Sequence, residues 1–165
     1  MGISLRPYEI EDAQLLYREL GQDFEMFRYT GWNPYADLES ARAFVAQCVE
    51  DHGKGSYSWL VLDREDPVGI VGVYDIDRSC GSAELGYSTF RKHWGRGFAT
   101  QAAKAAIDFI AQDEAISRLS AWAAVENAAS VKVLQACGMH LVDIQAGGLD
   151  VDGLAYDKAL YEIEF

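Results

Sequence analysis

The segment HWGRGFAT, residues 93–100, carries residue types suited to binding a ligand through the main chain. Gly95 and Gly97 let the backbone approach a ligand closely and turn successive N–H groups outward. The segment leads into a helix, whose N-terminus adds partial positive charge. Four basic residues cluster around the glycines of an otherwise acidic chain: Arg91, Lys92, His93 and Arg96. These features predict an anion site, with a pyrophosphate as the best fit. The alternative is an ordinary glycine turn with solvated basic side chains.

Two common phosphate-binding patterns fit this segment poorly. The chain contains no G-x-x-x-x-G-K-[ST] sequence, which a Walker loop requires. A dinucleotide fingerprint needs a third glycine where Thr100 stands, and an acidic residue about 20 positions later in the first β-α-β unit. Here the segment follows several predicted strands, and Glu126 comes later than that spacing. A dinucleotide-dependent oxidoreductase is therefore the weaker alternative.

A second segment, VENAASVKVL at residues 125–134, also joins a strand to a helix. Asn127 is suited to cap this helix, which places Ser130 in the first turn. An Asn cap followed by Ser is common for structural reasons alone. If both strand-to-helix junctions face one crevice, a ligand would lie between the two strand ends. One helix N-terminus would then hold phosphates and the other the reactive end.

The elements that position these segments follow from the spacing of apolar residues. Strand patterns occur at 3–8, 56–63, 67–77, 82–90, 118–125, 140–145 and 154–165. Apolar residues three and four apart predict helices at about 12–20, 38–50, 98–112 and 127–138. Several consecutive strands are joined by short turns, so we expect an α/β fold with a mixed sheet. The length predicts one domain, residues 1–165.

Composition limits the partners. The chain has 14 Lys and Arg against 26 Asp and Glu, a net charge of −12. This charge argues against nucleic-acid binding and favours cationic substrates such as amines. The start of the chain lacks the apolar stretch of a signal peptide, and no apolar run reaches membrane-spanning length. The scattered Cys and His residues give no metal-ligand spacing. We therefore expect a cytoplasmic monomer or homodimer without a metal.

Taken together, these segments resemble the GNAT superfamily of N-acetyltransferases, and within it the branch with the ribosomal-protein N-terminal acetyltransferases. The opening ISLRPYEIEDAQLL resembles that branch's first strand and helix. AELGYSTFRKHWGRGFATQAAKAAI resembles its acetyl-CoA motif, and VENAASVKVLQACGM its Asn-x-x-Ser segment. The resemblance spans nearly the whole chain. It implies a mostly antiparallel central sheet of about six to seven strands flanked by about four helices.

The resemblance also implies an activity and a set of binding residues. The activity is direct transfer of an acetyl group from acetyl-CoA to a primary amine, on a protein N-terminus or a small molecule, in a ternary complex. Backbone groups of Ser88, Thr89 and Phe90 would pair with pantetheine like an added strand. Asn127 would contact pantetheine, and Ser130 would lie near the thioester sulfur. A continuous run would wrap the pyrophosphate: Trp94, Gly95, Arg96, Gly97, Phe98, Ala99 and Thr100.

Acetyl transfer to an amine needs a base, donors for the developing oxyanion and a group that accommodates the leaving thiolate. We expect Glu84, on the central strand, to be the base, acting directly or through a water, with Glu126 as the runner-up. A plain surface carboxylate is the alternative for Glu84. Backbone N–H groups near Phe90 are the expected oxyanion donors. Ser130 is the expected partner of the thiolate, by hydrogen bonding more than by proton donation.

Two further features bear on this chemistry. Leu134 stands where many GNAT enzymes place a tyrosine acid, so a CoA-binding sensor or partner protein with impaired catalysis is an alternative. The aromatic loop at residues 21–36 would flank the acceptor. Trp32 and Tyr35 of this loop would form a wall for an ammonium group, or else belong to the core.

Overall fold

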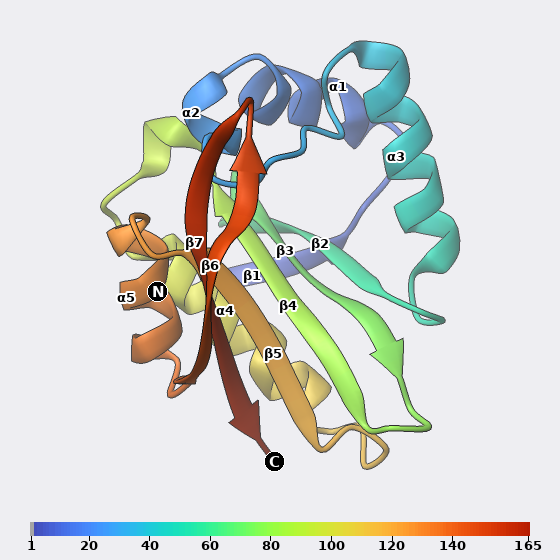
Figure 1. Ribbon diagram of the computed structural model, residues 1–165. Helices are drawn as coiled ribbons and strands as arrows, with labels where there is room; N and C mark the ends of the chain where they lie inside the picture. The colour runs from blue at the N-terminus through green and yellow to red at the C-terminus, as the bar shows by residue number, and fades with distance from the viewer. Residues whose placement is uncertain (1) are drawn as a thin grey trace.

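The computed structural model describes residues 2–165 and contains one seven-stranded sheet with helices on both faces (Figure 1). A π-helical segment at Tyr17–Gly21 extends α1, and a 3₁₀ turn at Arg91–His93 precedes the glycine loop. The elements confirm the predicted mixed fold. In chain order they are β1 (Ile3–Pro7), α1 (Asp12–Leu16), α2 (Phe24–Phe27), α3 (Leu38–Asp51), β2 (Tyr57–Asp63), β3 (Asp66–Asp77), β4 (Ser82–Thr89), α4 (Phe98–Ile110), β5 (Arg118–Ala124), α5 (Ala128–Ala136), β6 (His140–Val151) and β7 (Leu154–Glu164).

The sheet separates between its two central strands. Its order is β1-β2-β3-β4-β5-β7-β6, with β4 and β5 parallel and the other neighbours antiparallel. The β4–β5 ladder ends at the pair Glu84↔Ser120. Beyond it, β4 stays paired with β3 as far as Thr89, and β5 stays paired with β7 as far as Ala124. The two halves of the sheet therefore leave an opening between β4 and β5, which we call the β4–β5 gap.

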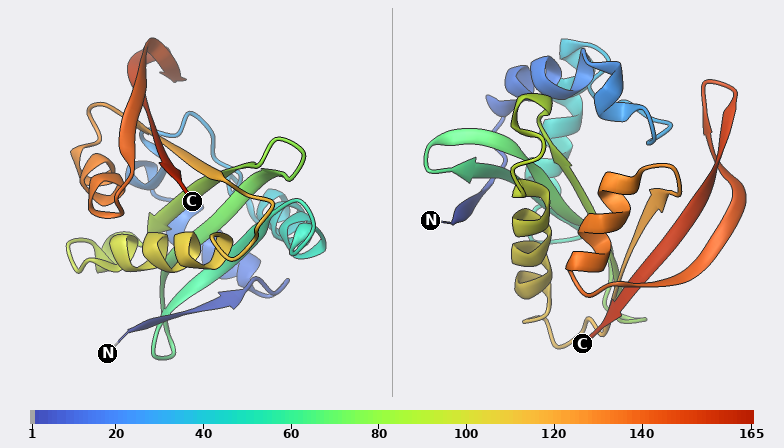
Figure 2. Two further views of the ribbon diagram at one scale, coloured as in Figure 1. Left: turned by 90° about the horizontal axis from the view of Figure 1, so that it is seen from below. Right: turned by 90° about the vertical axis from the view of Figure 1, so that its left-hand side faces the viewer.

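Two apolar clusters attach the helices to opposite faces of the sheet. In Figure 1, α4 lies behind the sheet, whereas α1 and α3 lie along its top and right; Figure 2 gives two further views. Ala83 and Leu85 of β4 belong to the cluster that includes α4 and α5. Because side chains alternate along a strand, Glu84 points to the opposite face, the face that carries α3. The second cluster includes residues of α1, α3 and β2: Leu16, Ala41, Val45 and Leu60.

The structure differs from the predicted elements in three places. The aromatic loop contains the short helix α2, which Asp23 caps by accepting a hydrogen bond from the Glu25 N–H. The first helix changes from α to π geometry at Tyr17. The sixth strand continues to Val151 rather than to residue 145. Most of β6 is exposed on both faces, so its sequence lacks the apolar alternation that would reveal its length.

No helix within residues 2–165 is both long and apolar enough to cross a membrane.

Gly69 allows β3 to lie close to the end of β4. A Cβ atom at this position would overlap the Ser88 carbonyl oxygen and lie 3.0 Å from the Thr89 Cα. Gly69→Ala should therefore destabilise the protein by ~2 kcal/mol, as overpacked sites generally do. Gly55→Ala is the matched control, because its Cβ would meet nothing within 4 Å. Thermal unfolding should show a melting temperature several degrees lower for Gly69→Ala alone. Equal melting temperatures would contradict this account of the β3–β4 contact.

Candidate active site

The edge of β4 presents backbone groups to the β4–β5 gap. The Phe90 N–H donates to the Val68 carbonyl at 2.9 Å. Along an antiparallel ladder, residues alternate between those whose backbone groups face the partner strand and those whose backbone groups face away. Ser88, two residues before Phe90, therefore directs its backbone groups toward β3 as Phe90 does. Tyr87 and Thr89 direct theirs away from β3, into the gap. The Thr89 carbonyl has this direction, since it accepts a hydrogen bond from the Trp94 indole Nε1 at 2.8 Å. The gap is therefore lined by main-chain groups of Tyr87 and Thr89.

This geometry corrects the expectations for Ser88 and Phe90. The backbone groups of Ser88 face β3, so they are not free to pair with pantetheine. The backbone of Phe90 is also engaged. Its N–H is paired with Val68, and its carbonyl accepts a hydrogen bond from the His93 N–H at 2.8 Å. Its side chain is fully buried in the α1–α3 cluster. Phe90 therefore has no free N–H to donate to an oxyanion. Tyr87, which the sequence analysis did not select, takes its place beside Thr89 at the edge of the gap.

The glycine loop ends at an uncapped helix. Gly95 and Gly97 have φ values of 74° and 78°, a left-handed conformation that favours glycine. A Cβ atom on either residue would meet nothing within 4 Å. Gly97 is the N-cap of α4, and no side chain caps this end of the helix. The N–H groups of the first turn, which includes Phe98, Ala99 and Thr100, are therefore suited to an anion.

The basic residues near this loop are paired with carboxylates, contrary to the predicted positive cluster. Arg91 Nη1 lies 3.0 Å from both carboxylate oxygens of Asp23. Lys92 Nζ lies 3.2 Å from Glu19 Oε1. These partners are far away in the sequence and belong to the segments around α1 and α2, so the local pattern did not reveal them. The arginine and lysine side chains next to the glycines are thus paired with carboxylates, whereas the N–H groups at the start of α4 have no side-chain cap.

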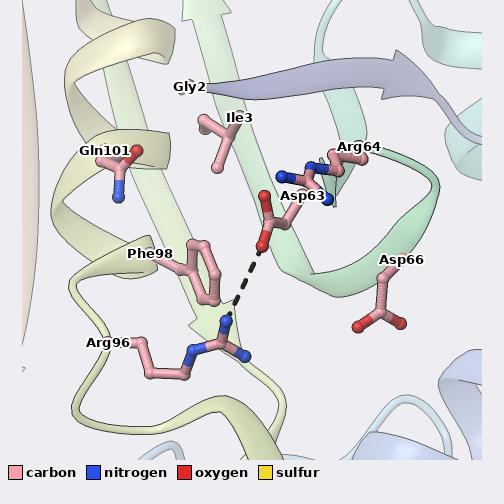
Figure 3. A pocket seen from close by; sticks show the side chains of 8 residues that line it. All are labelled: Gly2, Ile3, Asp63, Arg64, Asp66, Arg96, Phe98 and Gln101. Carbon is pink, nitrogen blue, oxygen red and sulfur yellow. Dashed lines mark ion pairs between the residues drawn. The ribbon is translucent and has the colours of Figure 1, made fainter.

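Arg96 extends into a pocket of about 480 Å³ on the β1 side of α4 (Figure 3). Its guanidinium forms an ion pair with Asp63 at 3.7 Å, contacts His93 Nδ1 at 3.0 Å and lies over the Phe98 ring. The pocket also contains Asp66, so its charge is mixed. The side chain of Arg96 therefore points away from the β4–β5 gap, and only its backbone belongs to the glycine loop.

Ser130 lies opposite β4, in the first turn of α5. The Asn127 side chain caps this helix by accepting a hydrogen bond from the Ser130 N–H at 3.3 Å. The Ser130 Oγ lies 2.8 Å from the Tyr87 hydroxyl, which also donates to the Ser130 carbonyl at 3.1 Å. Burial raises the pKa of Tyr87 to about 12, so the phenol stays protonated at neutral pH. The only signal in the sequence was the alternation that puts Tyr87 on the same face as Leu85.

Glu84 lies on the opposite face, in the last residue pair before the gap opens. Its Oε1 accepts a hydrogen bond from the Trp122 indole at 3.2 Å, and Lys158 Nζ lies 4.8 Å from the centre of the Trp122 ring. Burial and the negative charge of Asp75 raise the pKa of Glu84, against the opposing effects of Trp122 and Lys158. Glu84 is thus a half-buried carboxylate with an elevated pKa, whereas Glu126 is exposed in the turn after β5.

Of the remaining sequence candidates, Leu134 and Tyr35 belong to the core, whereas Trp32 is largely exposed. Leu134 is fully buried, and Tyr35 is buried and packs edge-on against Phe44. Trp32 also packs against Phe44, but 64% of its surface is exposed.

Cys137 is buried, and burial raises the pKa of its thiol, which disfavours a nucleophilic thiolate. Within residues 2–165, no group of three or more His, Cys, Asp or Glu side chains could hold a metal ion.

Comparison with known proteins identifies the family. Residues 3–140 match the family model described as an acetyltransferase (GNAT) domain. The protein p20 of Bacillus licheniformis, described as an uncharacterized N-acetyltransferase, is 33% identical over 161 residues. This alignment covers 95% of the chain and 85% of the relative. These matches remove the dinucleotide-dependent oxidoreductase from the alternatives.

Solved structures share the fold at low sequence identity. RimL, the ribosomal L7/L12 α-N-protein acetyltransferase, in complex with coenzyme A, superposes with a TM-score of 0.91 and 18% identity, covering 99% of this chain and 94% of that chain. The spermidine N-acetyltransferase of Vibrio cholerae, in complex with CoA and spermine, superposes with a TM-score of 0.88 and 21% identity. This match covers 98% of this chain and 95% of that chain. The fold of this chain is thus the fold of these acetyltransferases. Together with the family match over residues 3–140, this makes the chain a member of the GNAT family, an acetyl-CoA-dependent N-acetyltransferase.

Proposed function

We propose that this enzyme transfers the acetyl group directly to a primary amine, with acetyl-CoA and the amine approaching the β4–β5 gap from opposite faces of the sheet. The observation that carries this proposal is the placement of Glu84 and Ser130. Glu84 and Trp122 lie together on the α3 side, and Ser130 contacts Tyr87 on the α5 side. Glu84, the proposed base, and Ser130, the proposed partner of the leaving sulfur, therefore lie on opposite sides of the β4–β5 gap.

Main-chain groups would bind acetyl-CoA, which supplies the activated acetyl group. The backbone groups of Tyr87 and Thr89 that face the gap can pair with the amides of the pantetheine arm, as an added strand would. The uncapped start of α4 and the open space at Gly95 and Gly97 suit the pyrophosphate. Because Asn127 uses its carbonyl oxygen to cap α5, its NH₂ group remains to donate to pantetheine.

Glu84 would act as the base. The acceptor amine is an ammonium ion at neutral pH and must lose a proton before its nitrogen can attack. A carboxylate whose pKa is raised by burial accepts that proton more readily than an exposed one. The proton passes from the nitrogen to Glu84, directly or through a water, and then to solvent.

The remaining groups stabilise the negative charge that develops during transfer. Of the two N–H groups that face the gap, that of Tyr87 is the available donor for the acetyl oxygen, because that of Thr89 pairs with pantetheine. As the nitrogen–carbon bond forms and the carbon–sulfur bond breaks, Ser130 donates a hydrogen bond to the departing thiolate. The N-terminus of α5 adds favourable potential. The nitrogen gives up its second proton to solvent, and the thiolate takes one from solvent.

The acceptor side contains a cavity of about 350 Å³ between α3 and β3. Tyr74 lines this cavity and is the register partner of Glu84. Asp51 and Asp75 bring negative charge to the same cavity, which favours a cationic amine over an anionic one. The acceptor class that fits is therefore a primary amine in its ammonium form, on a small molecule or a protein N-terminus.

An acceptor screen tests the proposal directly. The enzyme with acetyl-CoA should release free CoA when supplied with one class among polyamines, small primary amines and N-terminal peptides. Release that no amine accelerates, together with tight CoA binding, would instead support a CoA-binding sensor or partner protein.

The glycine loop provides a binding test with a matched control. Gly97→Asn keeps a residue type that tolerates the left-handed conformation, but it fills the open space at the start of α4. We expect CoA to bind roughly 10-fold more weakly or worse, which corresponds to a loss of about 1.4 kcal/mol or more. Gly53→Asn is the control, since Gly53 has φ of 83° and equally open surroundings in another loop. Calorimetric titration with CoA that gives equal affinities for both variants would rule out this phosphate site.

Glu84 should leave a signature in the pH profile. Activity that needs a deprotonated Glu84 rises with pH through its elevated pKa, so kcat/KM should show an acidic limb. Glu84→Gln should lower kcat by roughly 10²- to 10⁴-fold and remove this limb. Asp75→Asn should move the limb to lower pH, because Asp75 helps to raise the pKa of Glu84. A limb that survives in Glu84→Gln and disappears in Glu126→Gln would assign the base to Glu126.

A further inference from the structure

A tyrosine hydroxyl reaches the α5 side of the gap from an unexpected element. Position 134 of α5 is Leu, and it is fully buried. The phenol of Tyr87 comes instead from β4, and it contacts Ser130 at the start of α5. We propose that Tyr87 is a positioning residue for acetyl transfer, whose hydroxyl directs the Ser130 O–H toward the departing sulfur. This inference rests on the proposed function, in which Ser130 is the partner of the thiolate.

The hydrogen bonds of the two hydroxyls permit two arrangements. Tyr87 lies 2.8 Å from the Ser130 Oγ and 3.1 Å from the Ser130 carbonyl oxygen. When Tyr87 donates to the carbonyl, the Ser130 proton can point at the tyrosine oxygen. When Tyr87 donates to Oγ instead, the Ser130 proton must point elsewhere, because a hydroxyl has one proton. Within residues 2–165, Tyr87 is the only hydrogen-bond partner of the Ser130 Oγ. The freed proton is therefore available to a ligand in the gap.

The backbone of Ser130 is held at the same time. Asn127 accepts the Ser130 N–H, and Tyr87 contacts both oxygens of the residue. The change between the two arrangements moves only hydroxyl hydrogens and requires no displacement of heavy atoms. A fixed donor of this kind is effective because it needs no reorganisation when charge develops on the sulfur.

Tyr87 supports the thiolate by hydrogen bonding and does not give up its proton. Burial raises the pKa of Tyr87 to about 12, whereas a thiol has a pKa of about 8.5. Full transfer of the proton from the phenol to the thiolate is therefore unfavourable. The phenol remains neutral and donates through Ser130, which makes the Ser130 O–H a stronger donor.

The direct test is the acidity of bound CoA, measured from the ultraviolet absorbance of its thiolate as a function of pH. In the wild type, the thiol pKa of bound CoA should lie below that of free CoA. Tyr87→Phe should raise it, with a roughly 3- to 10-fold change in the acid dissociation constant. Ser130→Ala should raise the thiol pKa of bound CoA at least as much as Tyr87→Phe does. The variant that carries both substitutions should raise this pKa no further than Ser130→Ala alone, because Tyr87 acts through Ser130. Tyr8→Phe is the control, since Tyr8 is a buried tyrosine in the α1–α3 cluster.

Steady-state kinetics provide the second readout. Tyr87→Phe should lower kcat by roughly 10-fold with little change in KM for acetyl-CoA, less than the ~100-fold expected for removing a direct donor. An unchanged thiol pKa in Tyr87→Phe, or a double variant in which the two effects multiply, would overturn the inference. The thiol titration needs no acceptor amine. If no amine is acetylated, the proposed function fails, and the titration still decides the role of Tyr87.

Discussion

The parallel ladder between β4 and β5 ends at Glu84 and Ser120, and the rest of the site depends on this short pairing. Beyond it, β4 follows β3 and β5 follows β7, so neither strand satisfies the facing edge of the other. The separation leaves the backbone edge of Tyr87 and Thr89 without a strand partner and places Glu84 in the last residue pair before the gap opens. One constraint of strand pairing thus leaves an unpaired strand edge, to which we assign acetyl-CoA.

An acidic enzyme needs a local source of positive potential to bind an anionic cosubstrate, and we propose that the main chain supplies it. The net charge of the chain is −12, and Arg91, Lys92 and Arg96 near the glycine loop are paired with carboxylates. Exposed ion pairs of this kind generally add little stability, but they orient the arginine and lysine side chains. The start of α4 has no side-chain cap, which is why we assign its N–H groups to the phosphates. In this proposal, the acidic remainder of the chain favours a cationic acceptor.

Local patterns in the sequence predicted the succession of strands and helices along the chain, the helix that follows the glycine loop and the Asn127 cap, because neighbouring residues determine each of these features. They could not predict contacts between distant segments. Arg91 pairs with Asp23 across 68 positions, and Tyr87 meets Ser130 across 43 positions. The first contact overturned the predicted basic cluster, and the second supplied a phenol that position 134 lacks. The engaged N–H of Phe90 likewise depended on the register of β3, which no local pattern specifies.

The most direct measurement is a titration of the isotope-labelled enzyme with CoA, followed through its backbone amide resonances. We expect the amides of Tyr87, Thr89, Gly95, Gly97 and Phe98 to shift most and to become protected from hydrogen exchange. These residues lie at the end of β4, in the glycine loop and at the start of α4. Shifts confined to the pocket around Asp63, Asp66 and Gln101, with the amides of Tyr87 and Thr89 unchanged, would contradict the central claim that the β4–β5 gap binds the cosubstrate.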